Sequence, residues 1–508
     1  MLQGDNAQPS SQRAAARSAP ISTVVLAAGE GTRMRSATPK VLHPLAGRPL
    51  VEHAVRAAAG VDPDQLVVVL GHGKEAVGEH LSSVATALGR EVTTAVQEQQ
   101  LGTGHAVSCG LAALPAQLTG TVLVSYGDVP LLDAGTLEGL LTEHAESGNA
   151  VTVLTAVVDE PTGYGRMLRD AEGNVTGIVE QKDATPEQSE IAEINSGVYA
   201  FDAAVLSDAL QRLSTDNAQG ELYLTDVLSI ARGDGRPVGA LVCADPWLVE
   251  GVNDRVQLSK LGAELNRRLV LNWMRQGVTV TDPVSVWLDC DVTLARDVVL
   301  EPGVQLRAGT SIGEGAAIGP DSTLTGCVVQ PGAKVIRSHG EGAEVGPGAS
   351  VGPFAFLRPG TSLGTGGKIG TFVETKNATI GGGTKVPHLT YVGDATIGEK
   401  SNIGAATVFV NYDGEAKHHT VIGSHARTGA DNMFVAPVEI GDGSYTAAGS
   451  VITEDVPPGA MAVARGRQRN IEDWVARRRP GTAADQAAQQ ARADKPTDDV
   501  QASNGEGR

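Results

Sequence analysis

An aliphatic residue recurs at every sixth position through much of the second half of this 508-residue chain. Val345, Val351, Leu357, Leu363 and Ile369 follow this spacing without a break, and glycine, proline and small residues fill the positions between them. A period of six matches neither an α-helix nor a β-hairpin, but it is typical of a parallel β-helix whose flat faces each turn one residue inward. We therefore predict a β-helix over residues 278–465. The same spacing runs through Val292, Val298 and Val304, and through Ile312, Ile318 and Leu324.

Two stretches interrupt this register, at residues 335–343 and 411–419. We expect both to be loops that leave the coil, and loops on such scaffolds often carry functional residues. The alternative interpretation is a glycine-rich region without regular structure, which the unbroken register disfavours.

The first half of the chain has a different pattern, in which short apolar runs alternate with alanine-rich amphipathic segments. This alternation predicts an α/β domain with a mostly parallel, Rossmann-like sheet over residues 21–251. Apolar residues at helical spacing over 254–276, followed by Gly277, predict a connecting helix within a linker arm at residues 252–277. The clearest strands are residues 21–26, 66–70, 121–125 and 151–158.

The composition limits the partners and the cellular compartment. Lysine and arginine number 40 and acidic residues 59, so the net charge of −19 disfavours nucleic acid and anionic membranes as partners. The chain has no apolar run long enough to cross a bilayer, and its four cysteines lack paired spacing. These features favour a cytoplasmic protein with reduced cysteines. We expect disorder at residues 1–20 and, within the C-terminal segment 466–508, from about Pro480, where aromatic residues are lacking.

A glycine-containing loop, residues 26–34 (LAAGEGTRM), follows the first predicted strand. Glycines there allow positive φ and bring backbone N–H groups close to a ligand, which suits phosphate. Arg33 and Lys40 add two cations for a polyanion such as a triphosphate. The alternative is an ordinary glycine turn beside two solvated cations. Asp128 follows another predicted strand, and ligands in such sheets collect where the strands end.

These motifs, taken together and in order, resemble the bacterial family of bifunctional GlmU enzymes over residues 21–475. In the first half, the matching residues are 26–40, Gln97 with 101–104, 127–128, 163–165, 177–180, 193–195 and 251–253. In the second half they are 357–360, 372–376, 388–391, 402–405 and 411–414. The resemblance implies a nucleotidyltransferase domain, a long helix and a left-handed β-helix of hexapeptide repeats.

The resemblance implies a uridylyl-transfer site in the first half. Attack of a sugar phosphate on UTP brings two anions together, so a Mg²⁺ ion held by Asp128 and Asn253 is expected there. The alternatives are a simple turn at Asp128 and a helix N-cap at Asn253, which could serve both roles. Arg33 and Lys40 bind phosphate and are candidate catalytic residues. The remaining implied contacts are Leu26, Ala27 and Gly29 with the nucleotide, Gln97, Gly102 and Thr103 with uracil, and Gly165, Glu180, Asn195 and Asn253 with the N-acetylglucosamine phosphate.

The resemblance also implies an acetyl-transfer site in the second half. Deprotonating an amine near neutral pH suits histidine, and His388 is the candidate general base, with Glu374 to orient it. The implied glucosamine-1-phosphate contacts are Arg358, Lys376, Tyr391, Asn402 and Lys417. The implied acetyl-CoA contacts are Ala405, Asn411, Tyr412, Ala430, Ala448 and Arg465.

Two positions depart from the family pattern. Ala430 stands where a serine is usual near the thioester carbonyl, which puts full acetyltransferase efficiency in doubt, and Ala406 replaces a common glycine. Three further histidines, His418, His419 and His425, have no metal-ligand spacing and are interpreted as solvated loop residues.

We therefore expect a homotrimeric enzyme that acetylates glucosamine-1-phosphate with acetyl-CoA and then joins N-acetylglucosamine-1-phosphate to UTP. One alternative is a single-function sugar-phosphate nucleotidyltransferase whose β-helix serves assembly or regulation. Another is a non-enzymatic scaffold, as in exchange-factor subunits of translation initiation. The combination of Lys376 with His388 argues against the first alternative, and that of Lys40, Asp128 and Asn253 against the second.

Overall fold

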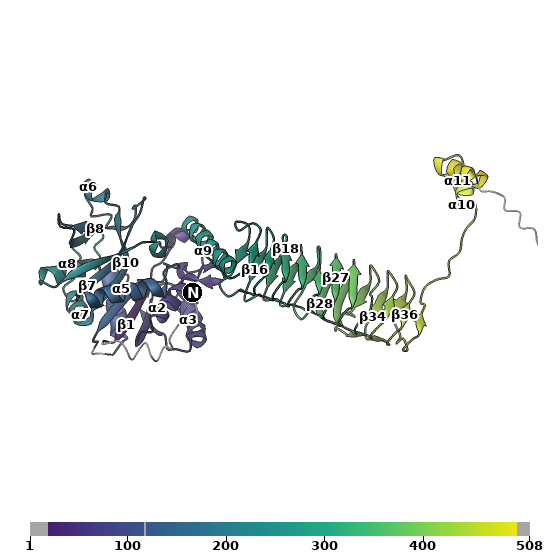
Figure 1. The fold of residues 1–508 in the computed structure, drawn as a ribbon, viewed down its shortest axis with the longest axis horizontal. Coiled ribbons are helices and arrows are strands. Elements are labelled where there is room, and N and C mark those ends of the chain that lie inside the picture. The colour runs from purple at the N-terminus through teal and green to yellow at the C-terminus, as the bar shows by residue number, and fades with distance from the viewer. Residues whose placement is uncertain (1–18, 116–117, 495–508) are drawn as a thin grey trace, which may run out of the picture.

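The computed structural model describes residues 19–115 and 118–494. An α/β domain lies at one end, and a long β-helix extends from it (Figure 1). Helix α9 (Arg255–Arg275) joins the two parts. Apart from residues 19 and 20, the predicted disordered N-terminal tail lies outside the described residues. No helix of the described ranges is long and apolar enough to cross a membrane.

The α/β domain is built on a mostly parallel sheet in the order β11-β7-β10-β6-β1-β4-β5. Strand β10 is antiparallel to both of its neighbours, and β8 and β9 extend the sheet as an antiparallel pair. The predicted α/β fold is thereby confirmed. The strands are β1 (Ile21–Ala27), β4 (Gln65–Leu70), β5 (Thr93–Val96), β6 (Thr121–Tyr126), β7 (Val151–Val157), β8 (Gly165–Arg169), β9 (Val175–Val179), β10 (Glu193–Asp202) and β11 (Val238–Cys243).

Helices cover both faces of this sheet, which explains why β1 is apolar along its whole length. Val24 and Leu26 pack in one core with helices α4 (Thr103–Ala112), α7 (Ala203–Leu210) and α8 (Asp226–Gly233). Val25 and Ala27 face the opposite core with α2 (Leu50–Gly60) and α3 (Lys74–Leu88). Helix α5 (Ala134–Glu146) packs on a further core that contains residues of β6 and β7.

The second half is a left-handed parallel β-helix. Parallel strands of successive coils pair residues that are 18 positions apart in the sequence. Trp287 pairs with Gln305, for example, and Thr293 with Ser311. Three short strands make one coil, for example β15 (Val299–Leu300), β16 (Gln305–Arg307) and β17 (Ser311–Ile312), and β18 (Ala317–Gly319) begins the next. Each face therefore takes six residues.

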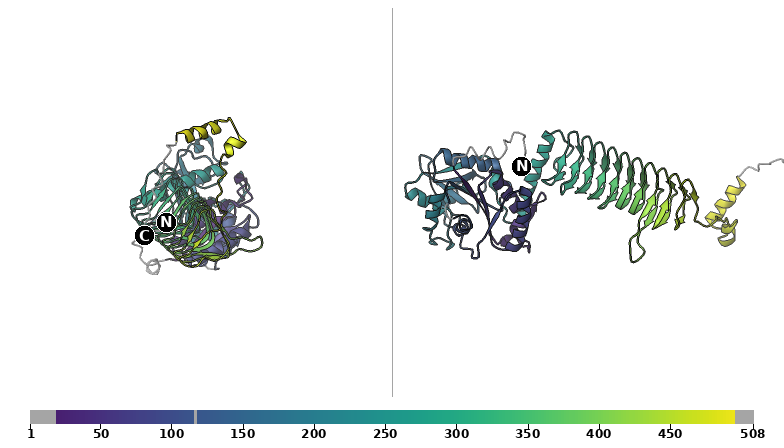
Figure 2. Two further views of the ribbon diagram at one scale, coloured as in Figure 1. Left: turned by 90° about the vertical axis from the view of Figure 1, so that its right-hand side faces the viewer. Right: turned by 90° about the horizontal axis from the view of Figure 1, so that it is seen from below.

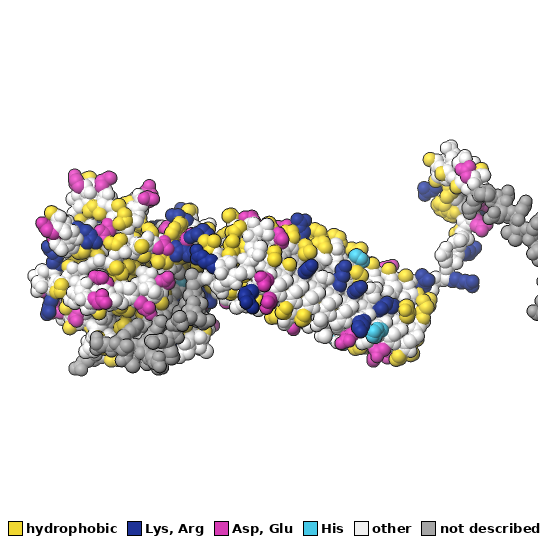
Figure 3. All heavy atoms as spheres, viewed as in Figure 1, with side chains coloured by type: hydrophobic (Ala, Val, Ile, Leu, Met, Phe, Trp, Pro, Cys, Tyr) yellow, Lys and Arg dark blue, Asp and Glu magenta, His cyan; other side chains and the backbone are white. Residues whose placement is uncertain are grey.

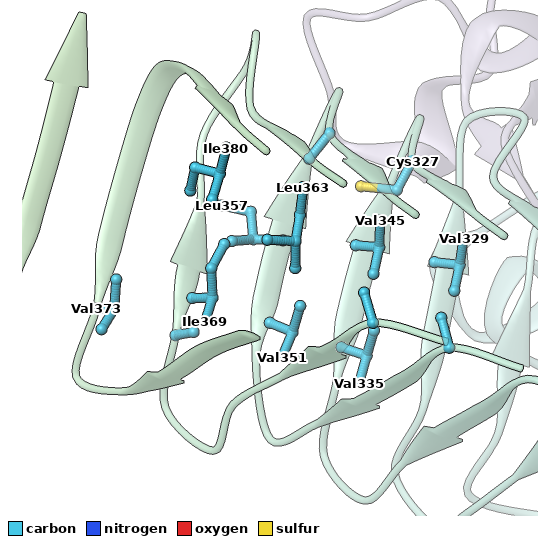
Figure 4. Packing of buried hydrophobic residues seen from close by; sticks show 14 of the residues in the cluster. Cys327, Val329, Val335, Val345, Val351, Leu357, Leu363, Ile369, Val373 and Ile380 are labelled. Atoms are coloured by element: carbon cyan, nitrogen blue, oxygen red, sulfur yellow. The ribbon is translucent and has the colours of Figure 1, made fainter. Parts of the chain in front are cut away.

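The interior of the coil is a set of stacked aliphatic side chains (Figure 4). Val345, Val351, Leu357, Leu363 and Ile369 all point inward and are at most 2% exposed. Each lies near its counterparts in the adjacent coils, so the cross-section stays constant and few aromatic residues fit. The predicted six-residue register is confirmed.

The prediction of a loop at residues 335–343 is wrong. This stretch stays in the coil as β21 (Lys334–Ile336) and β22 (His339–Glu341) and leads into β23 (Glu344–Val345). The inward positions Val335, Gly340 and Val345 are spaced by five residues, and Gly340 has no side chain for an aliphatic search to detect. A Cβ at Gly340 would lie 2.9 Å from Leu324 Cδ2 and 3.1 Å from Cys327 Sγ, so only glycine fits this shortened coil without displacing its neighbours.

The second interruption is a loop, as predicted. Between β31 (Val408–Val410) and β32 (Thr420–Ile422) the chain leaves the coil, and Tyr412 and Lys417 form an antiparallel bridge within the excursion. The right-hand view of Figure 2 shows a loop hanging from the C-terminal part of the coil. This segment brings Lys417 back toward the surface of the β-helix.

Helix α9 closes the first coil through one buried side chain, that of Asn266. Its Nδ2 donates to the Val286 carbonyl at 2.7 Å, and its Oδ1 accepts from the Leu288 N–H at 2.9 Å. The amide thus pairs with the backbone as a neighbouring strand would. The α/β domain adds a second contact, because the carbonyl of Ala46 accepts from the Cys290 N–H at 2.9 Å.

The C-terminal segment is more ordered than we expected. Helices α10 (Trp474–Arg478) and α11 (Ala483–Ala493) lie beyond the far end of the coil (Figure 1). The prediction of disorder from about Pro480 is therefore wrong for α11, while residues 495–508 lie outside the described ranges. Alanine and glutamine are good helix formers, and the Thr482 hydroxyl caps α11 by accepting from the Asp485 N–H.

We predict that Asn266→Ala loosens the first coil. The substitution leaves the buried Val286 carbonyl and Leu288 N–H without partners, which costs about 2 to 4 kcal/mol in the free energy of opening. Hydrogen exchange of peptides over residues 280–290, read by mass spectrometry, measures this change. Asn272→Ala is the control, because in the described chain the Asn272 side chain makes no hydrogen bond. Equal exchange in both variants would contradict the role of Asn266.

Candidate active sites

The loop after β1 wraps around Lys40. Gly31 adopts a positive φ of 66°, and a side chain there would overlap Cβ of Lys40. Gly29 faces open space, so its backbone is accessible to a ligand. Leu26 is the next-to-last residue of β1, and its carbonyl accepts from the Gly127 N–H at 2.8 Å. The segments that hold Ala27 and Asp128 therefore lie side by side at the carboxyl end of the sheet.

Four of the predicted site residues meet at this edge. Lys40 Nζ forms an ion pair with Asp128 Oδ2, in which the two side chains are only 11% and 17% exposed. The Val252 N–H donates to the Asp128 carbonyl at 2.8 Å and so places the next residue, Asn253, beside it. Arg33 Nη2 donates to Asn253 Oδ1 at 2.8 Å. Each of the two cations thus contacts one side-chain oxygen, Lys40 that of Asp128 and Arg33 that of Asn253.

Asn253 is not the N-cap of α9, contrary to the alternative considered above. The cap is Asp254, whose side chain accepts from the Gln257 N–H at 2.8 Å. The Gln257 side chain in turn accepts from the backbone N–H of Asn253 at 2.8 Å. These bonds fix the backbone of Asn253 and leave its side chain directed to Arg33.

Asp128 and Asn253 fit a magnesium ion chemically. Both offer oxygen, which Mg²⁺ prefers, and a site with few protein ligands leaves positions for water and phosphate oxygens. Asp128 Oδ1 makes no hydrogen bond to any of the described residues.

The residues expected to read uracil lie beside this edge. Gln97, directly after β5, is 6% exposed, and its Nε2 donates to the Gly102 carbonyl at 3.0 Å. Gln100 Nε2 donates to the Ala28 carbonyl at 2.9 Å and ties this segment to the opening loop. The Thr103 hydroxyl accepts from the Leu224 N–H at 3.0 Å. A cavity of about 440 Å³ adjoins Gln97.

The residues expected to hold the sugar also come together. Gly165 in β8 is the direct neighbour of Asn195 in β10, and the Val179 carbonyl, next to Glu180, lies against Gly165. Asn195 Oδ1 accepts from the Tyr199 hydroxyl and from the Gly197 N–H, both at 2.9 Å. Burial raises the pKa of Glu180, opposed by its contact with the Thr225 hydroxyl.

Sequence reasoning missed Tyr126 as a site residue. It is the last residue of β6, two positions before Asp128, and burial raises the pKa of its hydroxyl, as do the charges of Glu180 and Asp128. It also contacts Thr103. Tyr126 therefore lies between the residues expected to hold the base and those expected to hold the sugar. Its place at the carboxyl end of a strand was the available signal.

In the β-helix, three cations gather on one surface. Lys376 in β28 (Glu374–Ile380) lies close to Lys417 of the excursion loop, and this close approach and the Lys417 charge lower the pKa of Lys376. The Arg358 guanidinium adds a further lowering effect. Like charges held this close favour an anion between them, and a phosphate monoester carries enough charge to do so.

An acid–amide group borders the three cations. Asn411 Nδ2 donates to Asp394 Oδ2 at 2.6 Å and lies 3.4 Å from the Tyr391 hydroxyl. Burial raises the pKa of Asp394, but hydrogen bonds from Asn377 and Asn411 and the charges of the two lysines hold it below its usual value. Tyr391, Asn411, Lys376 and Lys417 are thus brought together.

His388 ends β29 (Lys385–His388) with an exposed side chain, and its imidazole makes no hydrogen bond to any described residue. Glu374 does not orient it within this chain, contrary to our expectation, because its carboxylate accepts from Arg358 Nη1 at 2.9 Å. The His388 backbone is fixed instead, since its carbonyl accepts from the Thr390 hydroxyl at 2.7 Å and from the Ala406 N–H at 3.2 Å.

Three expected acetyl-CoA contacts form a column on successive coils. The Ala405 carbonyl accepts from the Asp431 N–H at 2.7 Å, and the Ala430 carbonyl accepts from the Gly449 N–H at 2.9 Å, so Ala405, Ala430 and Ala448 lie one above another. Asn402 pairs with Lys385 and Arg427 on neighbouring coils.

Two further expected acetyl-CoA contacts, Tyr412 and Arg465, lie apart from this column, and Ala406 has an unusual backbone conformation. Tyr412 lies in the excursion loop, and Arg465 follows β38 (Met461–Ala462) without a hydrogen bond or ion pair from its side chain to the described residues. Ala406 adopts a positive φ of 59°, the conformation that favours the glycine usual at this position.

Comparison with known proteins agrees with the domains that we predicted for the two halves of the chain. Residues 23–190 match the family model of the MobA-like NTP transferase domain, and residues 419–454 match the bacterial transferase hexapeptide with six repeats. The bifunctional protein GlmU of Nocardia farcinica is 62% identical over 470 residues, covering 92% of this chain and 95% of that protein. The chain belongs to the GlmU family. Its relative from Corynebacterium glutamicum, also named bifunctional protein GlmU, is 59% identical over 92% of this chain and 96% of its own length.

We predict that Lys417→Met raises the pKa of Lys376 toward that of an ordinary lysine, because the substitution removes the main cause of its lowering. At neutral pH Lys376 then becomes less reactive toward an amine-selective reagent, and its labelling curve shifts to higher pH. Mass spectrometry of the labelled peptide measures this shift. Lys334→Met, at an exposed position on β21, is the control and leaves the curve in place. An unchanged curve in Lys417→Met would refute the contact.

Proposed function

We propose that this GlmU-family chain catalyses two consecutive transfers. The first moves an acetyl group from acetyl-CoA to glucosamine-1-phosphate. The second joins the resulting N-acetylglucosamine-1-phosphate to UTP and releases pyrophosphate, which yields UDP-N-acetylglucosamine. The observation that carries the proposal is the presence of two charge clusters in separate parts of the fold, Lys40 with Asp128 and Lys376 with Lys417.

In uridylyl transfer, a phosphate oxygen of the sugar attacks the α-phosphorus of UTP, and the bond to pyrophosphate breaks. A Mg²⁺ ion held by Asp128 and Asn253 would supply positive charge against the triphosphate. Lys40 and Arg33, which already lie on these two residues, would neutralise charge on the phosphates as the reaction proceeds. Glu180 and Asn195 would hold the N-acetylglucosamine moiety.

In acetyl transfer, the amine nitrogen of glucosamine-1-phosphate attacks the thioester carbonyl, and CoA leaves as the C–S bond breaks. His388 would take the proton from the amine, the general-base role that histidine commonly serves in enzymes. Lys376, Lys417 and Arg358 would hold the phosphate. The alanine column at 405, 430 and 448 offers a smooth surface for acetyl-CoA, although Ala430 cannot donate the hydrogen bond that serine would offer.

We infer that the active unit is a homotrimer. Hydrophobic side chains are exposed on the β-helix surface (Figure 3), and three of them, Phe354, Phe372 and Leu389, are 52%, 59% and 59% exposed. The rings of Phe354 and Phe372 stack 5.6 Å apart, and Leu389 directly follows the base candidate His388. A second copy of the chain that covers these residues would also complete the acetyl-transfer site. A cytoplasmic location fits the substrates.

The two alternative functions, a nucleotidyltransferase with a structural β-helix and a non-enzymatic scaffold, have less support from the structure. A nucleotidyltransferase with a purely structural β-helix would have no use for three cations, Arg358, Lys376 and Lys417, gathered on one surface of that β-helix. A non-enzymatic scaffold would have no use for the contacts of Lys40 with Asp128 and of Arg33 with Asn253.

We predict that the two activities separate by mutation. Asp128→Asn removes the charge at the proposed metal site and lowers pyrophosphate release at least about a hundredfold, while acetylation stays near the wild-type rate. His388→Asn does the converse, because it removes the base and leaves the α/β domain untouched. Pyrophosphate release and free CoA, assayed separately, measure the two rates. Loss of both activities in a folded single variant would refute the two-site proposal.

We predict that Phe372→Glu prevents assembly. A charged side chain on an exposed apolar surface costs little in the monomer but is strongly unfavourable when a second copy covers it. Light scattering should give the monomer mass for this variant and three times that mass for the wild type. Val284→Glu, at an exposed apolar position in the first coil, is the control and remains trimeric. A trimer with full acetylation activity in Phe372→Glu would exclude this surface as the interface.

A further inference from the structure

Gln97 is held by a neighbour that the reaction scheme above does not use. His105, in the first turns of α4, has its Nδ1 3.1 Å from Gln97 Nε2. The same Nε2 donates to the Gly102 carbonyl at 3.0 Å. The amide nitrogen of Gln97 is therefore placed between two groups, one from the backbone and one from an imidazole.

These contacts define which atom of the amide is which. The Gly102 carbonyl can only accept a hydrogen bond, so the Gln97 atom that faces it is the nitrogen. That nitrogen carries two hydrogens, and Gly102 and His105 each take one. The oxygen, Oε1, makes no hydrogen bond to any of the described residues and remains an acceptor for a ligand.

The tautomer of His105 follows from the same network. Because Nδ1 accepts from Gln97, a neutral imidazole carries its proton on Nε2. Nε2 lies 3.7 Å from Cys109 Sγ, one helical turn away, where a weak N–H to sulfur contact is possible. Burial raises the pKa of the Cys109 thiol and so favours its neutral form.

The site therefore presents a particular pair of groups to a base. Gln97 Oε1 is an acceptor, and the backbone N–H of Gly102, which has no partner among the described residues, is a donor. An imide, in which an N–H group stands next to a carbonyl, complements that pair. Cytosine has a lone pair where uracil has its N3–H, so it would face Gln97 Oε1 with two acceptors in contact.

We propose that His105 is the positioning residue that orients the Gln97 amide and thereby makes the nucleotide site accept uracil and reject cytosine. The inference deepens the proposed uridylyl transfer and rests on it. His105 touches no substrate in this account. Removing its acceptor frees one Gln97 hydrogen and lets the amide rotate, so that its nitrogen can serve cytosine.

The test compares UTP with CTP as substrates for pyrophosphate release at a fixed concentration of N-acetylglucosamine-1-phosphate. We expect His105→Leu to lower the ratio of kcat/KM for UTP to that for CTP by about tenfold or more. His105→Asn should retain most of the ratio, because its amide oxygen can replace Nδ1 as the acceptor. Ser108→Ala, on the same helix, is the matched control and should keep the wild-type ratio.

The possible outcomes are distinct. If His105→Leu slows both nucleotides equally, His105 has a merely structural role and the inference is overturned. If the wild-type chain releases no pyrophosphate from UTP, or does so equally well from CTP, the proposed function itself fails. Circular dichroism and the thermal unfolding of the same variants report whether the α/β domain is folded, and His105→Met carries the same test if His105→Leu does not fold.

Discussion

The β-helix depends on one repeated contact, in which an inward aliphatic side chain lies close to its counterpart in the next coil. Because coils of 18 residues stay in register, as in the pairing of Trp287 with Gln305, surface positions also stack in columns. The alanine column at 405, 430 and 448 is one such column. A binding surface can therefore be built from residues far apart in the sequence, provided that no coil slips. The excursion at residues 411–419 adds Lys417 to this surface without disturbing the stack.

The α/β domain follows a different constraint, the convergence of parallel strands at one edge. Strand β1 ends within the glycine-containing loop of residues 26–34, and β6 ends two residues before Asp128. The cations Arg33 and Lys40 therefore meet the side-chain oxygens of Asp128 and Asn253 there. Asn253 arrives from the start of α9 through the bond of Val252 to the Asp128 carbonyl. The same helix closes the β-helix through Asn266. One element thus holds Asn253 of the proposed nucleotide site just before its N-cap and anchors the second domain through Asn266, about three turns into the helix.

Much of this could be predicted from the sequence because both architectures impose short periods on it. The strand–helix alternation and the period of six predicted the two domains and the register. Gly340 escaped detection because a five-residue step filled by glycine leaves no aliphatic signal. The cap of α9 was ambiguous because Asn253 and Asp254 are both good capping residues and only the fold decides between them. The pairing of Glu374 with Arg358, and that of Gln97 with His105, depend on tertiary contacts that no local pattern records.

The central claim is that one chain performs both transfers at separate sites. The most direct test is ³¹P NMR of the wild-type protein with glucosamine-1-phosphate, acetyl-CoA, UTP and Mg²⁺. The account predicts UDP-N-acetylglucosamine and pyrophosphate in equal amounts, with one free CoA for each. Without acetyl-CoA, no sugar nucleotide should form, because the uridylyl site would then lack its acetylated substrate. Failure to form UDP-N-acetylglucosamine in the complete mixture, or equal formation of a sugar nucleotide without acetyl-CoA, would contradict it.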